Sequence, residues 1–267
     1  DADSDADSDT DTDADTDADS VTFSVMGDMP YSEADVATLA DQVERHNASS
    51  PAVFMVHLGD IQAQSVDCPQ SVYTTTADIL LALEVSTVVL PGDNEWNDCG
   101  DPSEAWGYWM DTFGTFWAAW PERPGFAVQG AWPLNVAWRE GGLLVVALTV
   151  SGGKVHDQGE WDEMLAFAAT WVDEQLAENA DATSLVVMMH AKPTDHHEAF
   201  LSPVLEELAA FAGPVLVIHA DGHVWIDDQP WDAAPEVRRI QVLPGEDALP
   251  LQVTATAGGF DIEREPF

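Results

Sequence analysis

Ionisable residues follow short, apolar, β-branched runs at five places along the chain. Three of these places read Gly-Asp, the fourth is a single His, and the fifth reads His-Ala-Asp-Gly-His; their key residues are Asp28, Asp60, Asp93 with Asn94 and Glu95, His190, and His219 with Asp221 and His223. Carboxylates and imidazoles are common ligands of divalent cations. So many charges in a partly buried site repel one another unless bound metal neutralises them. If these positions meet in space, the pattern predicts a metal centre that activates water.

Strands are expected to carry these residues, because ligands bind in open α/β sheets at the carboxyl ends of the strands. The apolar runs predict strands over 21–26, 52–58, 87–90, 143–149, 184–189 and 214–218. Amphipathic stretches predict helices from a Ser32 N-cap to about His46, and over 70–84, 157–178 and 198–211. Two later strands, over 237–242 and 251–256, have no helix between them. The fold class is therefore α/β, with a mixed sheet or a two-sheet sandwich.

The order of these motifs resembles that of the calcineurin-like metallophosphoesterases. The matching strings are GDMP at 27–30, GDIQ at 59–62, GDNE at 92–95, His190 in MMHAKP, and ADGH at 220–223. The longer strings GDMPYS, HLGDIQ and PGDNEWNDC resemble a divergent bacterial branch in which Gly-Asp-Asn-Glu-Trp replaces the usual third motif. The resemblance spans about 21–242. It implies a metallophosphoesterase-like domain over 21–267, an α/β sandwich of two mixed sheets flanked by helices.

The same resemblance implies two divalent metal ions. One ion would be held by Asp28, Asp60 and His223, and the other by Asp60, Asp93, His190 and Asp221. Asp60 would then bridge the two ions. In this family the ions generate a hydroxide that attacks a phosphoester, so the expected substrate is a small phosphoester.

The sequence departs from the family pattern at four positions. Pro30 replaces a His ligand, Asp93 replaces an Asn ligand, and Asn94 replaces the His that supports the leaving group. Asp221 replaces the first His of the last motif. The swaps exchange imidazole and amide for carboxylate, which favours Mn²⁺, Fe²⁺ or Mg²⁺ over Zn²⁺, with Ca²⁺ also compatible. They also weaken the Lewis acidity felt by a bound water, so the hydroxide forms at higher pH.

Catalytic roles are assigned to Asn94, Glu95 and His219. Since Asn94 cannot be a general acid, that role falls to His57, His196 or His219, unless these imidazoles only orient metal ligands. Glu95 is a ligand, a general base or an acceptor beside the ligands. Lys192, two residues after His190, is the base best placed to meet an anionic substrate, with a surface ion pair as the alternative.

The charge balance excludes two classes of partner. The chain of 267 residues holds 49 acidic against 8 basic residues, a formal charge of −41. Nucleic-acid backbones and anionic membranes both need a cationic face, so neither is an expected partner. The acidity suits a saline or cation-rich surrounding, or serves solubility alone. No apolar run approaches the roughly 20 residues of a membrane span.

Residues 1–20 alternate Asp with Ala, Ser or Thr and have nothing to bury, which predicts a disordered, Asp-rich tether. Collection of Ca²⁺ is the alternative, but the turn Gly and bidentate Glu of an EF-hand loop are absent from this stretch. Cys68 and Cys99 follow the second and third motif loops, so we expect a disulfide, with two buried thiols as the alternative. The tether and the disulfide together favour a secreted or cell-envelope location.

Ten aromatic residues lie within 106–138, and five of them, from Trp106 to Trp120, have helical spacing. This spacing indicates a buried helix face, with a substrate-covering lid or a sugar-stacking surface as the alternative.

Three functional hypotheses follow. The first is a metal-dependent phosphoesterase that hydrolyses a small phosphoester. The second is a weakened or inactive metallophosphoesterase-like module that binds metal at a surface, because imidazoles are lost at Pro30 and Asn94. The third treats the acidic strand ends as decoration for high salt. The substrate's identity and the oligomeric state stay open.

Overall fold

A computed structural model describes residues 20–121, 123 and 125–267. Its strands form two sheets. The five-stranded sheet has the order β12-β11-β1-β2-β3 and the seven-stranded sheet the order β4-β5-β6-β7-β8-β10-β9. Strands of the first are β1 (Val21–Met26), β2 (Phe54–His57), β3 (Ser86–Val89), β11 (Leu251–Thr256) and β12 (Gly259–Glu263). Strands of the second are β4 (Ala127–Val128), β5 (Val136–Glu140), β6 (Leu143–Ala147), β7 (Ser184–Met188), β8 (Val215–His219), β9 (Ile226–Asp228) and β10 (Arg238–Gln241).

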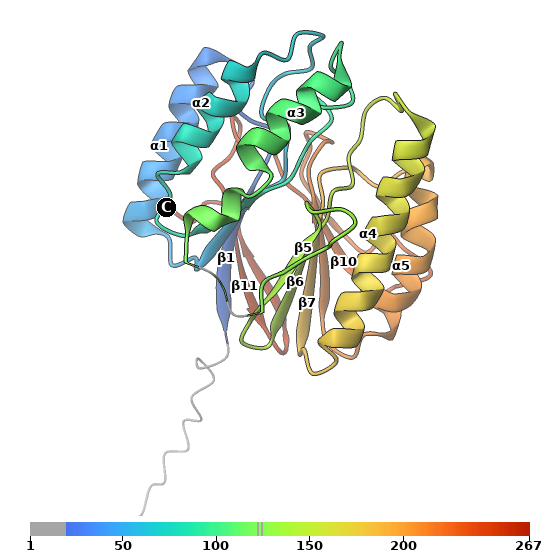
Figure 1. Cartoon of the computed structure of the whole chain (residues 1–267). Helices are drawn as coiled ribbons and strands as arrows, with labels where there is room; N and C mark the ends of the chain where they lie inside the picture. Colours follow the sequence, from blue (N-terminus) through green and yellow to red (C-terminus); the bar gives the residue numbers. More distant parts are fainter. Residues whose placement is uncertain (1–19, 122, 124) are drawn as a thin grey trace, which may run out of the picture.

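Helices cover the outer face of each sheet, so the molecule has four layers (Figure 1). On the five-stranded sheet lie α1 (Glu33–Ser49), α2 (Gln70–Leu80) and α3 (Pro102–Phe113). On the seven-stranded sheet lie α4 (Gln158–Glu178) and α5 (Glu198–Ala210). Three of these helices begin where a side chain accepts a backbone N–H, at Ser32 for α1, at Asp101 for α3 and at Asp157 for α4.

Alternation along the strands builds three hydrophobic cores. In β2, Phe54 and Val56 face the core between the sheets, whereas Met55 faces the helices. In β7, Val186 faces the core between the sheets and Val187 faces α4 and α5. Successive side chains of a strand point to opposite faces, so continuous apolar runs suit strands that are buried on both sides.

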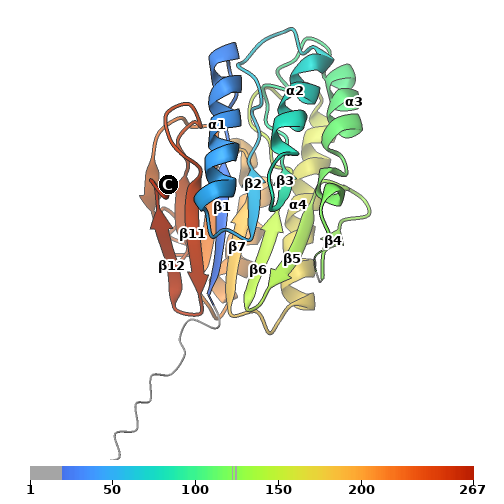
Figure 2. The same ribbon diagram turned by 90° about the vertical axis from the view of Figure 1, so that its left-hand side faces the viewer.

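Parallel pairing brings the chemistry-bearing loops to one end of the molecule. β1, β2 and β3 are parallel neighbours, as are β6, β7, β8 and β10. Figure 2, turned by 90°, shows β12, β11, β1 and β2 side by side beneath α1. The loops that follow β1, β2, β3, β7 and β8 therefore open at the carboxyl edge of the two sheets.

The fold class predicted from the sequence is confirmed, and most predicted elements are present. The corrections concern boundaries. The predicted strand 52–58 is restricted to Phe54–His57, the strand 143–149 ends at Ala147, and the helix 70–84 ends at Leu80. Short edge strands such as β4, β9 and β12 were not predicted.

The aromatic segment packs mainly in the interior. Trp109 and Phe113 of α3 are fully buried against the five-stranded sheet, as a buried helix face predicts. The helix ends at Phe113, however, and a 3₁₀ turn over Phe116–Ala119 follows.

Cys68 and Cys99 form the predicted disulfide, with Cα atoms 5.9 Å apart. Within the described part of the chain, no helix is both long and apolar enough to cross a membrane. Apart from Ser20, the tether expected over 1–20 lies outside the described residues.

Candidate metal centre

The loops at the strand ends hold four candidate site residues in an unusual backbone conformation. Asp28, Asp60, Asp221 and His223 all have positive φ, between 52° and 66°. Residues other than glycine rarely adopt this left-handed region, and each such residue costs about 1–3 kcal/mol, so it persists only where the surroundings impose it. Such strain gathers at functional sites.

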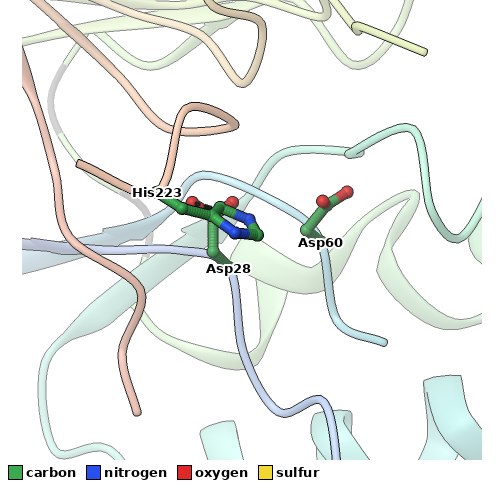
Figure 3. A group of neighbouring side chains, drawn as sticks. All are labelled: Asp28, Asp60 and His223. Atoms are coloured by element: carbon green, nitrogen blue, oxygen red, sulfur yellow. Dashed lines mark ion pairs between the residues drawn. The ribbon is translucent and has the colours of Figure 1, made fainter. Parts of the chain in front are cut away.

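One group of possible ligands combines both sheets. Asp28, Asp60 and His223 each present a ligand atom, and these atoms lie within 4.8 Å of one another (Figure 3). Asp28 follows β1, Asp60 follows β2 and His223 follows β8. The backbone N–H of Asp28 donates to the carbonyl of Gly59 at 2.9 Å, which ties the first two loops together.

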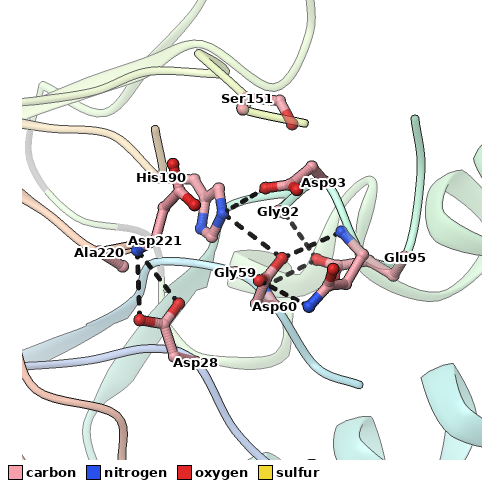
Figure 4. A network of polar contacts seen from close by, with 12 residues as sticks. Asp28, Gly59, Asp60, Gly92, Asp93, Glu95, Ser151, His190, Ala220 and Asp221 are labelled. Carbon is pink, nitrogen blue, oxygen red and sulfur yellow. Dashed lines mark hydrogen bonds and ion pairs between the residues drawn. The ribbon is translucent and has the colours of Figure 1, made fainter. Parts of the chain in front are cut away.

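A second group shares Asp60 with the first. Asp60, Asp93 and His190 likewise present ligand atoms within 4.8 Å, and all three are buried. His190 Nε2 lies 2.8 Å from Asp93 Oδ1 and 3.4 Å from Asp60 Oδ1 (Figure 4). Its Nδ1–H donates to the carbonyl of Leu58 at 2.9 Å, so Nε2 is the ring nitrogen that faces the two carboxylates and would hold a cation in place of its proton.

Asp221 borders both groups but belongs to neither. Its backbone N–H donates to both carboxylate oxygens of Asp28, at 3.2 and 3.3 Å. Its own Oδ2 accepts the backbone N–H of Lys192 at 3.1 Å. A Cβ on Gly152 would stand 2.9 Å from Asp221 Oδ2 and 3.1 Å from Asp93 Oδ1, so the loop after β6 closes this side of the site.

Asn94 and Glu95 contact the site through its framework. Asn94 donates to Asp60 twice, from its backbone N–H to Oδ1 at 3.1 Å and from Nδ2 to Oδ2 at 2.8 Å. The fully buried Glu95 accepts the backbone N–H groups of Asp60, Ile61 and Gly92 and so holds the second and third loops together. Both positions are central, but these contacts are those of positioning groups.

The imidazoles of His57 and His219 lie outside the two ligand groups. His57 Nδ1 accepts the N–H of Gly59 at 3.1 Å, so its Nε2–H donates to the carbonyl of Met29. His219 is fully buried, with Nδ1 2.9 Å from the carbonyl of Ala220. Burial lowers the pKa of His57 to about 4 and that of His219 to about 3, so both are neutral at pH 7.

Burial also shifts the site carboxyls. It raises the pKa of Asp28 and Asp60, and it brings the pKa of Glu95 to about 7. Burial opposes ionisation of Asp93 too, but the hydrogen bond with His190 and the charge of that imidazole together outweigh burial and lower the pKa of Asp93. The pKa of His190 is raised despite burial, because Asp60 and Asp93 stabilise its cationic form. Buried carboxyls such as these ionise readily only when a positive charge lies beside them, which is what a bound cation provides.

Two residues of the site were not predicted from the sequence. The Tyr31 hydroxyl donates to Asp60 Oδ2 at 3.2 Å and lies 3.1 Å from His223 Nε2. Burial, and to a smaller extent the negative charge of Asp60, raise the pKa of Tyr31, so its side chain stays a neutral phenol. Gln62 Nε2 donates to the carbonyl of Asn94 at 2.7 Å. The available signals were the positions of these residues in the motif strings, Tyr31 in GDMPYS and Gln62 in GDIQ.

Comparison with known proteins agrees with this geometry. The family model described as calcineurin-like phosphoesterase matches residues 21–225. None of the curated proteins matches the chain in sequence.

Solved structures share the fold. "GAP50 the anchor in the inner membrane complex of Plasmodium" aligns with a TM-score of 0.58 at 7% identity, covering 92% of this chain and 84% of that one. TT1561 of Thermus thermophilus aligns with a TM-score of 0.55 at 14% identity, covering 91% and 98%. A 5'-nucleotidase precursor from the same organism aligns with a TM-score of 0.50 at 14% identity, covering 93% of this chain and 54% of that one.

The chain therefore belongs to the calcineurin-like phosphoesterase family, the class of metal-dependent phosphoric ester hydrolases that the sequence resembled. Membership implies divalent metal ions, and the two Asp and His groups have the donor chemistry to hold them.

Proposed function

We propose that the protein hydrolyses a small phosphoester with two divalent ions bound at the two groups that share Asp60. The observation that carries the proposal is that both groups share the carboxylate of Asp60. One carboxylate can contact two ions only if the ions lie close together, and the ions of two-metal phosphoesterases are about 3.5–4 Å apart. Asp28 and His223 would complete one ion's ligands, and Asp93 and His190 the other's. When bound, the ions would supply the nucleophile by lowering the pKa of a coordinated water.

The chain's own residues prepare these ligands. The carbonyl of Leu58 fixes the His190 tautomer, and Asn94 and Tyr31 both donate to Asp60. Asp221, beside Gly152, adds a carboxylate at the edge of the site. This donor set holds more carboxylate than imidazole, which supports Mn²⁺, Fe²⁺ or Mg²⁺ over Zn²⁺, with Ca²⁺ also compatible. The catalytic roles of Asn94, Glu95 and His219 stay predictions. The hydrogen bonds of Asn94 and Glu95 support roles in positioning Asp60 and its neighbouring loops.

Hydrolysis of p-nitrophenyl phosphate with and without Mn²⁺ tests the proposal. Asp60→Asn should lower kcat/KM by at least about a hundredfold, because it removes the shared carboxylate. Asp78→Asn, the same change at an exposed position of α2, serves as the matched control. Equal rates in the wild type and Asp60→Asn would refute the proposal.

A metal-binding surface module without turnover is the second candidate. Its support is that the amide of Asn94 is engaged by Asp60 and by the carbonyl of Gln62, so it offers no proton donor where the family has His. The Plasmodium protein of similar fold is described as an anchor. Stoichiometric Mn²⁺ binding with no hydrolysis across a broad phosphoester panel would favour this candidate.

We also infer a secreted or cell-envelope location. The disulfide between Cys68 and Cys99 supports it, because such bonds persist in oxidising compartments. Fractionation of the native cells followed by thiol labelling tests it. The protein should appear in the medium or envelope with both cysteines blocked, and a cytosolic, reduced protein would refute the inference.

A further inference from the structure

A cavity of about 510 Å³ lies beside Tyr31, whose hydroxyl contacts the first ligand group. It lies between the loops that follow β1 and β2, the first turn of α1 and one face of α2. Its volume falls within the range of small-molecule sites, roughly 300–1,000 Å³. The cavity therefore has room for the organic part of a substrate.

Tyr31 connects the cavity to the candidate metal centre. Its side chain lines the cavity, and its hydroxyl contacts both Asp60 and His223. Ile61, which also lines the cavity, directly follows Asp60 in the chain. A phosphoryl group held beside Asp60 would therefore have its ester substituent at the mouth of this cavity.

The walls are suited to an uncharged group. Val36, Ile61 and Val72 give apolar contacts from α1, the second loop and α2. Hydroxyl side chains of α2 and Tyr31 add polar atoms, and Glu33 adds a negative charge. Among the described residues that line the cavity, none is basic. A second phosphate or a carboxylate would thus meet repulsion without compensation.

A second cavity near the site has the opposite chemistry. It measures about 320 Å³, and Lys192, His196 and His197 line it together with Asp221. It is smaller, and Lys192 gives it the cation that the cavity beside Tyr31 lacks, although the carboxylate of Asp221 offsets part of that charge. An anionic substituent would favour this cavity, whereas a neutral apolar one would favour the cavity beside Tyr31.

We propose that the cavity beside Tyr31 is the leaving-group subsite, and that the substrate is a phosphomonoester of a neutral, largely apolar alcohol. This inference rests on the proposed function for the phosphoryl end of the substrate. The subsite itself follows from the cavity's position, its apolar walls and its lack of basic residues.

Titration calorimetry with phosphonates, which are not hydrolysed, tests the subsite on the full chain with Mn²⁺. The probes are 1-naphthylmethylphosphonate, methylphosphonate and methylenebisphosphonate. We expect the naphthyl probe to bind at least about tenfold more tightly than methylphosphonate, because its ring is buried in the cavity, and the bisphosphonate to gain nothing from its second charge.

Four variants test which cavity binds the naphthyl ring. Val72→Trp and Val36→Trp, which fill the cavity from α2 and from α1, should each abolish the preference for the naphthyl probe over methylphosphonate. Val53→Trp at an exposed position and Lys192→Met in the second cavity should keep it. The inference is overturned if the wild type shows no preference, or if Lys192→Met removes it and the filled cavities do not.

The two proposals fail separately. A naphthyl preference without hydrolysis of any naphthyl ester would refute the proposed function alone. Hydrolysis of p-nitrophenyl phosphate without a naphthyl preference would refute the subsite alone.

Discussion

Asp60 is the residue on which most of the site converges. It is 3% exposed, has a left-handed φ of 57°, and accepts hydrogen bonds from Asn94 and Tyr31. A buried carboxylate held so tightly in a strained conformation is preorganised for a cation.

Tyr31→Phe tests whether the Tyr31 hydroxyl orients metal ligands. Tyr31 directly follows Pro30, the position at which the family has a His ligand. The change removes the hydroxyl that contacts Asp60 and His223 but keeps the ring. We expect the Mn²⁺ affinity to fall by about tenfold, as for other groups that orient metal ligands, with little change in melting temperature. Calorimetric Mn²⁺ titration measures it, with Tyr108→Phe on α3 as the control. An unchanged affinity would assign Tyr31 to packing.

His46 makes one contribution to stability depend on pH. It is 1% exposed on α1, with Nε2 3.0 Å from Ser24 Oγ, and burial lowers its pKa from 6.5 to about 4. The unfolded chain binds the proton more readily, so this contribution is fully present above pH 6.5 and is lost as the pH falls toward 4.

Urea unfolding of the wild type and His46→Gln from pH 7.5 to 4 checks this effect. The wild type should lose about 2 kcal/mol relative to the variant across that window. Titrations elsewhere in the molecule are common to both proteins and cancel in the difference. Parallel stability curves would show that His46 does not contribute.

At the scale of elements, the parts that sequence could predict are those fixed by local signals. Ser32 and Asp157 cap helices, and the apolar runs of β1 and β11 coincide with the predicted strands. Strand ends carrying Asp28, Asp60 and His190 were predicted for the same reason. Their convergence depended only on parallel pairing within each sheet and on the packing of the two sheets.

The rest depended on contacts between distant segments. α2 ends at Leu80, and the chain that follows it is held by Asn47 of α1, which donates to the carbonyl of Ala82 and accepts the N–H of Glu84. Tyr31 and Gln62 reach the site only through the paths of their loops. The ADGH motif predicted Asp221 at the site, but its position beside both ligand groups depends on the loop after β8.

The third loop depends on Gly92 for its close approach to the second. A Cβ at this position would collide with the Asp60 carboxylate and backbone. Gly92→Ala should therefore lower the Mn²⁺ affinity by at least about tenfold. Gly107→Ala is the matched control, because a Cβ there meets nothing within 4 Å and alanine favours the α3 helix by about 1 kcal/mol. Mn²⁺ titration of both variants measures this difference. Equal Mn²⁺ affinities of Gly92→Ala and Gly107→Ala would show that the site does not need the close approach of the second and third loops.

At the scale of the whole molecule, the site joins two sheets. Asp28, Asp60 and Asp93 extend from the five-stranded sheet, and His190 and His223 extend from the seven-stranded one. The formal charge of −41 makes added cations favourable in general, which any measurement of metal must separate from specific binding. Micromolar Mn²⁺ in a background of molar NaCl achieves this, because salt screens surface charge far more than it screens a buried site.

The most direct test is therefore elemental analysis of the chain after dialysis against micromolar Mn²⁺ in 1 M NaCl. The wild type and Asp78→Asn should each retain about two Mn²⁺ ions, and Asp60→Asn one or none, because both ligand groups share Asp60. A wild type that retains no ion, or an Asp60→Asn variant that retains as many as the wild type, would contradict the account.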